Sequence, residues 1–438
     1  MKTLSRLILI ALFAVGLTTG LSANGLNLNG FGARATGMGG AYVGLANDFT
    51  AVFWNPAGLA ELTKAQFGLA ADALIPTGKY AIGSFSMSTE KKFYPAGLVG
   101  YFQPIGNNIV VGLGAYTLSG LGADWVNTGL EEALVSPLPP AAFTPALGAY
   151  DWKSYIGSIT VAPAIAIKIN DMFMIGATFN INYGFFQTNQ WGGFTVVTPT
   201  APPAGNVGAP PMIVNFGQQT LNVKGWGYGA TVGVKIKPAE WISIGATYRM
   251  ESKVKMTGTM EIENITILGL AESSGAEMKV PSPMWLAGGI ALKPVEGLTL
   301  SFDAHYTNWG KLQTVAITLA DPVWALALAD EASLVLNWKD KTQLRAGVEY
   351  DFGTFAIRGG YYYDPAPAPE TTMNILTPSF TYNSFALGFG YKAGGLKFDA
   401  AVEYLTGQKR TITDPTAAMP GVYQEHILVP TVGLSFSF

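Results

Sequence analysis

The chain has 438 residues, of which 49% are hydrophobic and only 13% are charged, and its formal net charge is −3. Soluble domains usually carry about 25% charged residues, so this composition indicates too little polar surface to cover the chain in water. The mild acidity argues against nucleic acid as a partner, and the lack of cysteine excludes a disulfide framework, a thiolate nucleophile and a cysteine metal site.

The first 23 residues have the organisation of a secretory signal peptide. Lys2 and Arg6 precede an apolar run, and small residues follow up to Ala23. This pattern predicts a signal peptide over 1–23 with cleavage before Asn24, and an N-terminal membrane anchor is the alternative. Cleavage removes two basic residues and no acidic one, so the mature chain carries a net charge of −5.

A compact turn, Asn55-Pro56-Ala57-Gly58, lies in the segment 24–62. Asn55 can accept a hydrogen bond from its own backbone, and Pro56 fixes φ and cannot extend a strand. Gly58 permits the positive φ of a tight reversal. The residues therefore predict a turn or a one-turn helix, and the strands that follow decide its purpose.

Apolar and polar residues alternate along most of the chain after residue 62. In the segment 173–185, one alternate set is apolar with Phe173 and Phe185 at its ends, and the other is small or polar. A strand places these sets on opposite faces, and this pattern is typical of a transmembrane barrel strand with aromatic girdles. Counting such segments predicts an all-β fold, a 14-stranded antiparallel transmembrane β-barrel over 63–438. The segments are 64–74, 94–103, 108–118, 155–168, 172–186, 224–237, 240–251, 283–293, 297–309, 341–351, 354–363, 382–392, 394–405 and 427–438.

Short and long connections alternate between the predicted strands. Bacterial outer-membrane barrels have short periplasmic turns and long outer loops. The segment 24–62 then begins on the periplasmic side, and we expect it to lie in the lumen as a plug, or hatch. The turn at Asn55 would lead from the hatch into the first strand. The predicted long connections are 75–93, 119–154, 187–223, 252–282, 310–340, 364–381 and 406–426.

Two prolines interrupt the predicted strands. Pro163 and Pro430 lie in the middle of alternating segments, where proline cannot donate a hydrogen bond to the ladder. Each predicts a β-bulge, and a local gap in the ladder is the alternative.

The stretch NGFGARATGMGGAYVGLANDFTAVFWNPAGLAEL, residues 29–62, closely resembles the N-terminal hatch of the FadL-type outer-membrane transporters. This family carries long-chain fatty acids and other hydrophobic compounds, and it includes TodX-like aromatic hydrocarbon channels. The Asn-Pro-Ala motif of the family falls on Asn55, Pro56 and Ala57. The resemblance covers essentially the whole mature chain and continues in 228–258, 298–315 and 357–392.

The resemblance implies a fourteen-stranded barrel in the bacterial outer membrane, which agrees with the count of segments. It also implies passive uptake: outer loops capture the ligand, a lumen site beside the hatch binds it, and it leaves sideways through a gap at a kink in the third strand. That strand is 107–120 here, and Gly112 and Gly114 share one face and can allow a kink. Ordinary small residues of a barrel strand are the alternative interpretation.

The same resemblance implies the partners. They are a hydrophobic small-molecule ligand, outer-membrane lipid and lipopolysaccharide, and the barrel assembly machinery, because the terminal Phe438 resembles the assembly signal of outer-membrane proteins. Barrels of this family look monomeric, and we therefore expect a monomer.

Three arginines are candidate ligand-binding residues. Arg249, Arg345 and Arg358 fall on the small and polar face of their strands, and an arginine can hold the carboxylate of a fatty acid through two hydrogen bonds. The alternative is structural, because buried charges normally pair, and Glu349 and Glu403 also fall on lumen faces.

Two outer loops are apolar enough to suggest capture of a hydrophobic ligand. Exposed apolar surface usually marks an interaction site, and packing that closes the top of the barrel is the alternative. The first choice is loop 252–282, with loop 187–223 and its Phe194 as partner. The apolar residues of the first loop are Ile262, Ile265, Ile267, Leu268 and Leu270.

The case for catalysis is thin. There are two histidines, and His305, beside Asp303, has no nucleophile motif near it. Metal-ligand spacing, a phosphate loop and a dinucleotide fingerprint are missing, so we expect no enzyme and no cofactor or metal. Besides the fatty-acid channel, the open alternatives are an aromatic hydrocarbon or alkane channel of the same family, a general porin for polar solutes, and a structural or adhesive barrel. The hatch and the apolar loops argue against the porin.

Overall fold

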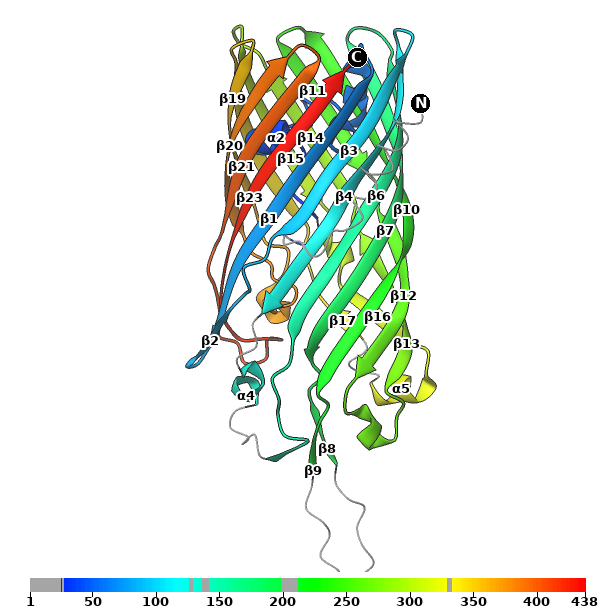
Figure 1. The fold of residues 1–438 in the computed structure, drawn as a ribbon, viewed down its shortest axis with the longest axis vertical. Coiled ribbons are helices and arrows are strands. Elements are labelled where there is room, and N and C mark those ends of the chain that lie inside the picture. Colours follow the sequence, from blue (N-terminus) through cyan, green and yellow to red (C-terminus); the bar gives the residue numbers. More distant parts are fainter. Residues whose placement is uncertain (1–24, 26, 126–128, 136–141, 198–211, 329–332) are drawn as a thin grey trace, which may run out of the picture.

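The computed structural model describes residues 25, 27–125, 129–135, 142–197, 212–328 and 333–438. The predicted signal peptide lies outside the described residues. Figure 1 shows a tall barrel with the C-terminus and short connections at one end and long strand extensions at the other. In outer-membrane barrels the short turns are periplasmic. No helix among the described residues is long and apolar enough to cross a membrane.

The barrel is a closed antiparallel ring of 14 strands, as the sequence predicts. The first strand, β1, pairs with the last, β23, and this pairing closes the ring. Several strands are interrupted and consist of two pieces in line. The strands are β1 (Gln66–Ile82), β3 (Tyr94–Ile105), β4 (Ile109–Trp125), β6 (Trp152–Lys168), β7 (Phe173–Trp191), β10 (Gln218–Ala239), β11 (Ile242–Arg249) with β12 (Ser252–Ile262), β13 (Ser273–Ser282) with β14 (Trp285–Leu292), β15 (Leu298–Thr307) with β16 (Thr314–Leu319), β17 (Ser333–Val335) with β18 (Lys341–Asp351), β19 (Phe355–Asp364), β20 (Tyr382–Ala393), β21 (Leu396–Gly407) with β22 (Arg410–Ile412), and β23 (Gly421–Ser437).

The remaining elements are short. Strand β2 (Phe85–Ser88) extends the ring beside β1, and a small sheet on the outer side combines β5 (Phe143–Thr144), β8 (Phe194–Val197) and β9 (Met212–Asn215). The helices of the hatch are α2 (Ala33–Gly37), α3 (Ala51–Trp54) and η1 (Pro56–Glu61). The outer loops carry α4 (Leu130–Leu134), η3 (Ile265–Leu268), η4 (Trp309–Lys311), α5 (Pro322–Ala327) and η5 (Glu370–Thr372).

The alternation that predicts the strands corresponds to two faces of the wall. Phe179 and Tyr228 face outward and are 52% and 61% exposed, and their rings stack 6.1 Å apart. The alternate residues of the same two strands face the lumen. Asn180 and Thr231, for example, are buried there, and a 2.9 Å hydrogen bond joins their side chains. The apolar set therefore faces lipid and the polar set faces the lumen, as expected for a membrane barrel.

The predicted loop 252–282 is wrong in extent, because most of it is strand. β12 and β13 occupy its two ends and pair with each other. Beyond the lipid-facing band the pattern reverses: Val254 and Met256 are buried inside, and Lys253 and Lys255 are exposed outside. An outward face in water needs polar residues, so a search for outward apolar alternation misses these strands.

The predicted bulges at Pro163 and Pro430 are wrong as well. Pro163 stays in register opposite Leu113, and the pairing of β6 with β7 stops at Val161 and resumes in the same register at Ala164. The pairing of β1 with β23 skips the residues around Pro430 in the same way. Each proline removes a donor from one neighbouring ladder and leaves a gap without an extra residue.

Candidate ligand-binding site and hatch

The hatch packs tightly in the lumen because the barrel wall lacks side chains where the hatch touches it. A Cβ atom on Gly176 would lie 2.3 Å from the carbonyl carbon of Pro56, and one on Gly233 would lie 2.1 Å from Asn55 Oδ1. Both distances are far below van der Waals contact. Glycine is therefore required at these lumen-facing positions of β7 and β10 for the hatch to fit.

Asn55 of the Asn-Pro-Ala motif ties the hatch to itself and to the wall. Its Oδ1 accepts a hydrogen bond from Ala57 N at 3.2 Å, which caps η1, and Pro56 takes the first helical position. Its Nδ2 donates to Val43 O at 3.1 Å and to Val234 O of β10 at 3.0 Å. The fully buried Asn55 therefore uses both ends of its amide.

Carboxylates on the wall and in the hatch make further attachments. Asp303 Oδ2 on β15 accepts hydrogen bonds from Tyr42 N at 2.8 Å and Val43 N at 2.7 Å. Glu61 of the hatch forms ion pairs with Lys235 and Lys237 of β10. Burial by itself raises the pKa of Glu61, but the two lysines together lower it below its ordinary value.

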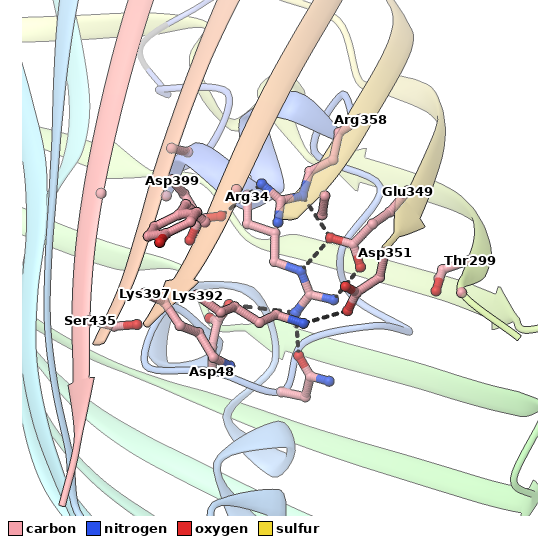
Figure 2. Close-up of a pocket in the computed structure, with 18 of the residues that line it drawn as sticks. Arg34, Asp48, Thr299, Glu349, Asp351, Arg358, Lys392, Lys397, Asp399 and Ser435 are labelled. Carbon is pink, nitrogen blue, oxygen red and sulfur yellow. Dashed lines mark hydrogen bonds and ion pairs between the residues drawn. The ribbon is translucent and has the colours of Figure 1, made fainter. Parts of the chain in front are cut away.

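An ion network joins α2 to the wall at the short-turn end of the barrel. Arg34 donates from Nε and Nη2 to the two oxygens of Glu349, each at 2.8 Å. Arg358 donates from Nε to Glu349 at 2.6 Å and from Nη1 to Asp399 at 2.7 Å. Figure 2 shows these side chains meeting between the hatch and strands β18, β19 and β21. Arg358 is therefore fully paired with carboxylates.

The same network borders a cavity of about 560 Å³. The turns between β10 and β11 and between β14 and β15 contribute to its lining, which places it at the short-turn end. Charged groups of both signs dominate the side chains drawn in Figure 2. The charged residues of the lining are Arg34, Asp48, Glu240, Lys293, Glu296, Glu349, Asp351, Arg358, Lys392, Lys397 and Asp399.

Arg249 has very different surroundings, although it lies on the same lumen face as Arg358. Its guanidinium carbon lies 4.7 Å from the ring centre of Phe53 and 4.8 Å from that of Trp285. Nη2 donates to Phe53 O at 2.9 Å, and Nε has no hydrogen-bond partner among the described residues. The Arg249 side chain is buried, and no carboxylate of the described residues lies closer to it than 4.0 Å.

Aromatic rings surround this cation on the hatch side and on the wall. The ring centre of Phe53 lies 5.4 Å from that of Tyr116 of β4 and 5.2 Å from that of Phe31 of the hatch, and both contacts are edge-to-face. The hydroxyl of Tyr116 is buried, and it too lacks a hydrogen-bond partner among the described residues. We call Arg249, Phe31, Phe53, Tyr116 and Trp285 the lumen cage. It combines apolar rings with two unsatisfied polar groups.

Arg345 is intermediate between the other two arginines. Its Nη1 donates to Gly39 O of the hatch at 3.3 Å, and its Nη2 donates to Gln343 Oε1 at 2.7 Å. Its guanidinium also lies 4.4 Å from the ring centre of Tyr362. Arg345 thus donates one hydrogen bond to the hatch and one to the wall, whereas Arg249 donates only one, to the hatch. The Nε of each arginine has no hydrogen-bond partner among the described residues.

The wall beside Tyr116 has an incomplete ladder. The pairing of β3 with β4 ends at Leu98 opposite Tyr116, although β3 begins at Tyr94 and β4 runs on past it. Gly112 and Gly114 lie inside the paired part, and the register of β4 against β6 shifts between Thr117 and Ser119.

The hatch reaches this incomplete edge. Asn27 forms an isolated antiparallel bridge with Ser119, and Leu28 N donates to Leu118 O at 3.4 Å. The segment at Asn27 and Leu28 therefore lies against β4 just beyond Tyr116, where the pairing of β4 with β3 has ended.

The apolar loop residues divide into two groups. Ile262 and Ile265 are buried, and Leu270 packs against the same cluster of buried apolar residues. Ile267 and Leu268 of η3 are exposed, at 44% and 39%. The loop therefore packs in part against other buried apolar residues and presents an exposed apolar tip.

Phe194, predicted in the partner loop, is 39% exposed. It packs against Phe143 with ring centres 5.3 Å apart and against Trp191 at 6.1 Å. It therefore belongs to the small outer sheet and keeps one side open to solvent.

Sequence reasoning missed the aromatic members of the lumen cage. Phe53 and Trp285 flank Arg249, and Trp285 is the residue opposite Arg249 in the pairing of β11 with β14. Cross-strand pairing was the available signal, because directly opposed side chains lie about 5 Å apart. The approach of Phe53 depends on how the hatch folds and leaves no periodic signal.

Comparisons with known proteins agree with this architecture. A family model described as "Outer membrane protein transport protein (OMPP1/FadL/TodX)" matches residues 14–438. No curated protein matches the chain. Among solved structures, a Pseudomonas aeruginosa FadL homologue is similar with a TM-score of 0.74 at 17% identity, and the match covers 94% of this chain and 100% of the other.

Two toluene transporters have similar structures. TodX of Pseudomonas putida matches with a TM-score of 0.67 at 16% identity, covering 95% of this chain and 100% of that one. TbuX of Ralstonia pickettii matches with a TM-score of 0.66 at 17% identity, covering 94% and 99%. Identities this low establish a shared fold, and the family model carries the assignment of family.

Proposed function

This chain belongs to the OMPP1/FadL/TodX family of outer-membrane transport proteins; it is an outer-membrane channel for hydrophobic compounds and not an enzyme, and from this premise we propose that its cargo is long-chain fatty acids. Uptake is passive. The ligand is captured by the outer loops, bound in the lumen cage and released sideways through the wall.

The observation that carries the proposal is the state of Arg249. A buried cation is costly unless it is paired, yet Arg249 has one hydrogen bond and no carboxylate among the described residues. A fatty acid brings one carboxylate, which the free donors of Arg249 can bind, and an alkyl chain, which suits the rings of Phe53 and Trp285. The unpaired hydroxyl of Tyr116 supplies a further donor.

Capture by the outer loops rests on their exposed apolar residues. Ile267, Leu268 and Phe194 present apolar side chains to solvent. An alkyl chain that leaves water for such a surface gains about 0.8 kcal/mol per buried methylene. The ligand then moves toward the lumen cage, where its carboxylate finds a partner.

We infer a sideways exit by comparing two routes out of the lumen cage, one through the short-turn end of the barrel and one through the wall between β3 and β4. The cavity at the short-turn end is lined with charged groups, which an alkyl chain crosses only at a cost in free energy. The ladder between β3 and β4 is incomplete next to Tyr116, and this part of the wall is the exit that we propose. Gly112 and Gly114 on the same strand remain the predicted site of a kink, and Asn27 would have to leave Ser119 as ligand passes.

An aromatic hydrocarbon channel is the second candidate. The aromatic rings of the lumen cage favour it, because such rings suit a monoaromatic ligand as well as an alkyl chain. Two proteins of similar structure are toluene transporters by their names. On this alternative, Arg249 holds Phe53 of the hatch in place and binds no ligand.

Cleavage of residues 1–23, a hatch over 24–62 and a monomeric barrel over 63–438 are also part of the proposal. They rest on the sequence patterns and on the family resemblance. Assembly by the barrel assembly machinery is expected for the same reason.

Uptake by cells tests the choice between the ligands. Cells with and without the protein receive radiolabelled oleate or toluene, and a variant lacking 24–62 is measured beside them. Saturable, protein-dependent oleate uptake supports the fatty-acid channel. Toluene uptake alone moves the assignment to the hydrocarbon channel. Uptake of neither, with sugar entry after loss of the hatch, contradicts hydrophobic transport and favours a porin.

A further inference from the structure

Four lysines gather on the outside of the barrel where β10, β12 and β13 leave the lipid-facing band. Figure 1 shows these strands running together on one side of the barrel. The four side chains are all exposed, and Lys255 and Lys279 are 58% and 63% open to solvent. We call them the lysine cluster: Lys224, Lys253, Lys255 and Lys279.

The strand pairing brings like charges together in this cluster. Lys255 lies directly opposite Lys279 in the pairing of β12 with β13, and like charges at directly opposed positions destabilise a sheet. Glu277 offsets part of this repulsion, at 2.9 Å from Lys255 and 3.7 Å from Lys279. One carboxylate thus serves two ammonium groups.

The other two lysines have no such partner. Neither Lys224 nor Lys253 has an acidic group within 4.0 Å among the described residues. Glu261 of β12 and Glu251, the residue before β12, are the other nearby acidic residues. Neither forms an ion pair with the lysine cluster in the described part of the chain. The cluster is therefore a cationic patch that its own strands do not neutralise.

The height of the patch is indicated by the aromatic residues beside it. Trp226 and Tyr228 follow Lys224 on the outward face of β10 and are 54% and 61% exposed. Trp226 lies opposite Lys255 in the pairing of β10 with β12. Trp and Tyr gather where the hydrocarbon of a membrane meets its headgroups, so the lysine cluster lies at headgroup level on the outer side.

We propose that the lysine cluster is a binding site for lipopolysaccharide, whose phosphate groups take the place of the missing counterions. The acyl chains lie against the outward apolar face of β10 and its aromatic residues, and the phosphates meet the four ammonium groups. Clusters of basic residues at membrane level attract anionic headgroups with about 1 kcal/mol per Lys. Hydrogen bonds between ammonium and phosphate are charge-assisted and strong.

Equilibrium binding of labelled lipopolysaccharide to the purified full-length protein in detergent tests the site. The cluster variant is K224Q/K253Q/K255Q/K279Q. Its matched control is K79Q/K91Q/K311Q/K409Q, which changes the net charge equally at exposed lysines elsewhere. Heat-dependent gel mobility reports that each barrel is folded, and a second probe is the same glycolipid after removal of its phosphates.

The proposal expects the cluster variant to bind lipopolysaccharide at least about tenfold more weakly than the wild type, and the control to bind as the wild type does. The wild type should lose affinity for the dephosphorylated probe and at high salt. Equal binding by the cluster variant and the control overturns the site. Equal affinity of the wild type for both probes overturns the role of phosphate, and this result does not depend on the folding of any variant.

Discussion

Arg249 and Arg358 face the same lumen at different heights, and their surroundings differ completely. Arg358 donates to two carboxylates of the wall, Glu349 and Asp399. Glu349 also accepts from Arg34 of the hatch, so the network joins the hatch to the wall. Arg249 lies between Phe53 and Trp285 and donates to a single backbone carbonyl. A buried charge is stable when it is paired. Arg358 has its carboxylates, whereas Arg249 has none among the described residues, and we propose that a ligand anion pairs with it.

The difference teaches that the neighbours of a lumen arginine, from the wall and from the hatch, decide its role, and not the face on which it lies. At the short-turn end the hatch offers Arg34 to the shared carboxylate of Glu349. Higher in the lumen it offers Phe53, a ring and a backbone carbonyl. Ion pairs and hydrogen bonds therefore fix the hatch around Arg358, whereas the surroundings of Arg249 are apolar and leave some of its donors free.

The largest predicted effect comes from breaking the ion network. Glu349→Gln removes the carboxylate shared by Arg34 and Arg358, and an unpaired buried charge costs about 3–5 kcal/mol. We expect the hatch to loosen while the barrel remains closed. Ion conductance in planar bilayers should rise above that of the wild type.

Glu296→Gln is the matched control, because Glu296 lines the same cavity but is exposed and forms no ion pair among the described residues. Its conductance should equal that of the wild type. A Glu349→Gln channel as tight as the wild type would show that the network does not hold the hatch.

A smaller effect is expected at the motif of the hatch. Asn55→Ala leaves the carbonyls of Val43 and Val234 without their side-chain donor, and each unsatisfied buried group costs about 1–3 kcal/mol. The variant should melt at a lower temperature than the wild type. Asn107→Ala, in an exposed short turn, is the control, and equal melting of both variants would contradict the anchoring role.

The smallest effect is a pH dependence at Glu61. The folded protein lowers the pKa of Glu61 below its ordinary value because Lys235 and Lys237 outweigh the effect of burial. The pair therefore stabilises the fold fully above the unfolded pKa of about 4.3, and this stability is lost as pH falls through the lower folded value.

The stability difference between the wild type and Glu61→Gln should accordingly be present at pH 7 and shrink in acid. Lys235 also donates to two hatch carbonyls, which limits the loss. Chemical unfolding of both proteins at a series of pH values measures the difference, and a difference that grows in acid would mean that the sign is wrong.

The strands were predictable because each one divides its residues between lipid and lumen. All fourteen segments correspond to strands in the barrel, from β1 to β23. The outer extensions β12 and β13 were not predicted. Above the lipid-facing band the outward face of the barrel is in water, so their apolar residues, such as Val254, point inward. Two prolines were assigned bulges, whereas the ladder omits a few pairs and keeps its register.

The site was only partly predictable. The alternation of apolar and polar residues places Arg249, Arg345 and Arg358 equally on the lumen face. It shows which face a residue occupies and does not show its neighbours. Some of their partners come from neighbouring strands, since Glu349 lies opposite Arg358 and Trp285 lies opposite Arg249. The other partners come from a hatch whose path is set by close packing against Gly176 and Gly233, and such contacts between distant segments leave no local pattern. The approach of Phe53 to Arg249 could not be predicted for this reason, whereas Trp285 could have been found from the strand pairing.

The central claim is that Arg249 recognises the carboxylate of a fatty acid. The most direct test is the affinity of the purified protein for oleate and for oleyl alcohol, which share one chain and differ in charge. The wild type should bind oleate about tenfold more tightly, as a hydrogen bond to a charged group contributes about 1.5–3 kcal/mol. Arg249→Met should lose this preference, and Arg345→Met, which alters a buried arginine that holds the hatch, should keep it. Equal affinity of the wild type for both ligands, or a preference that survives in Arg249→Met, would contradict the account.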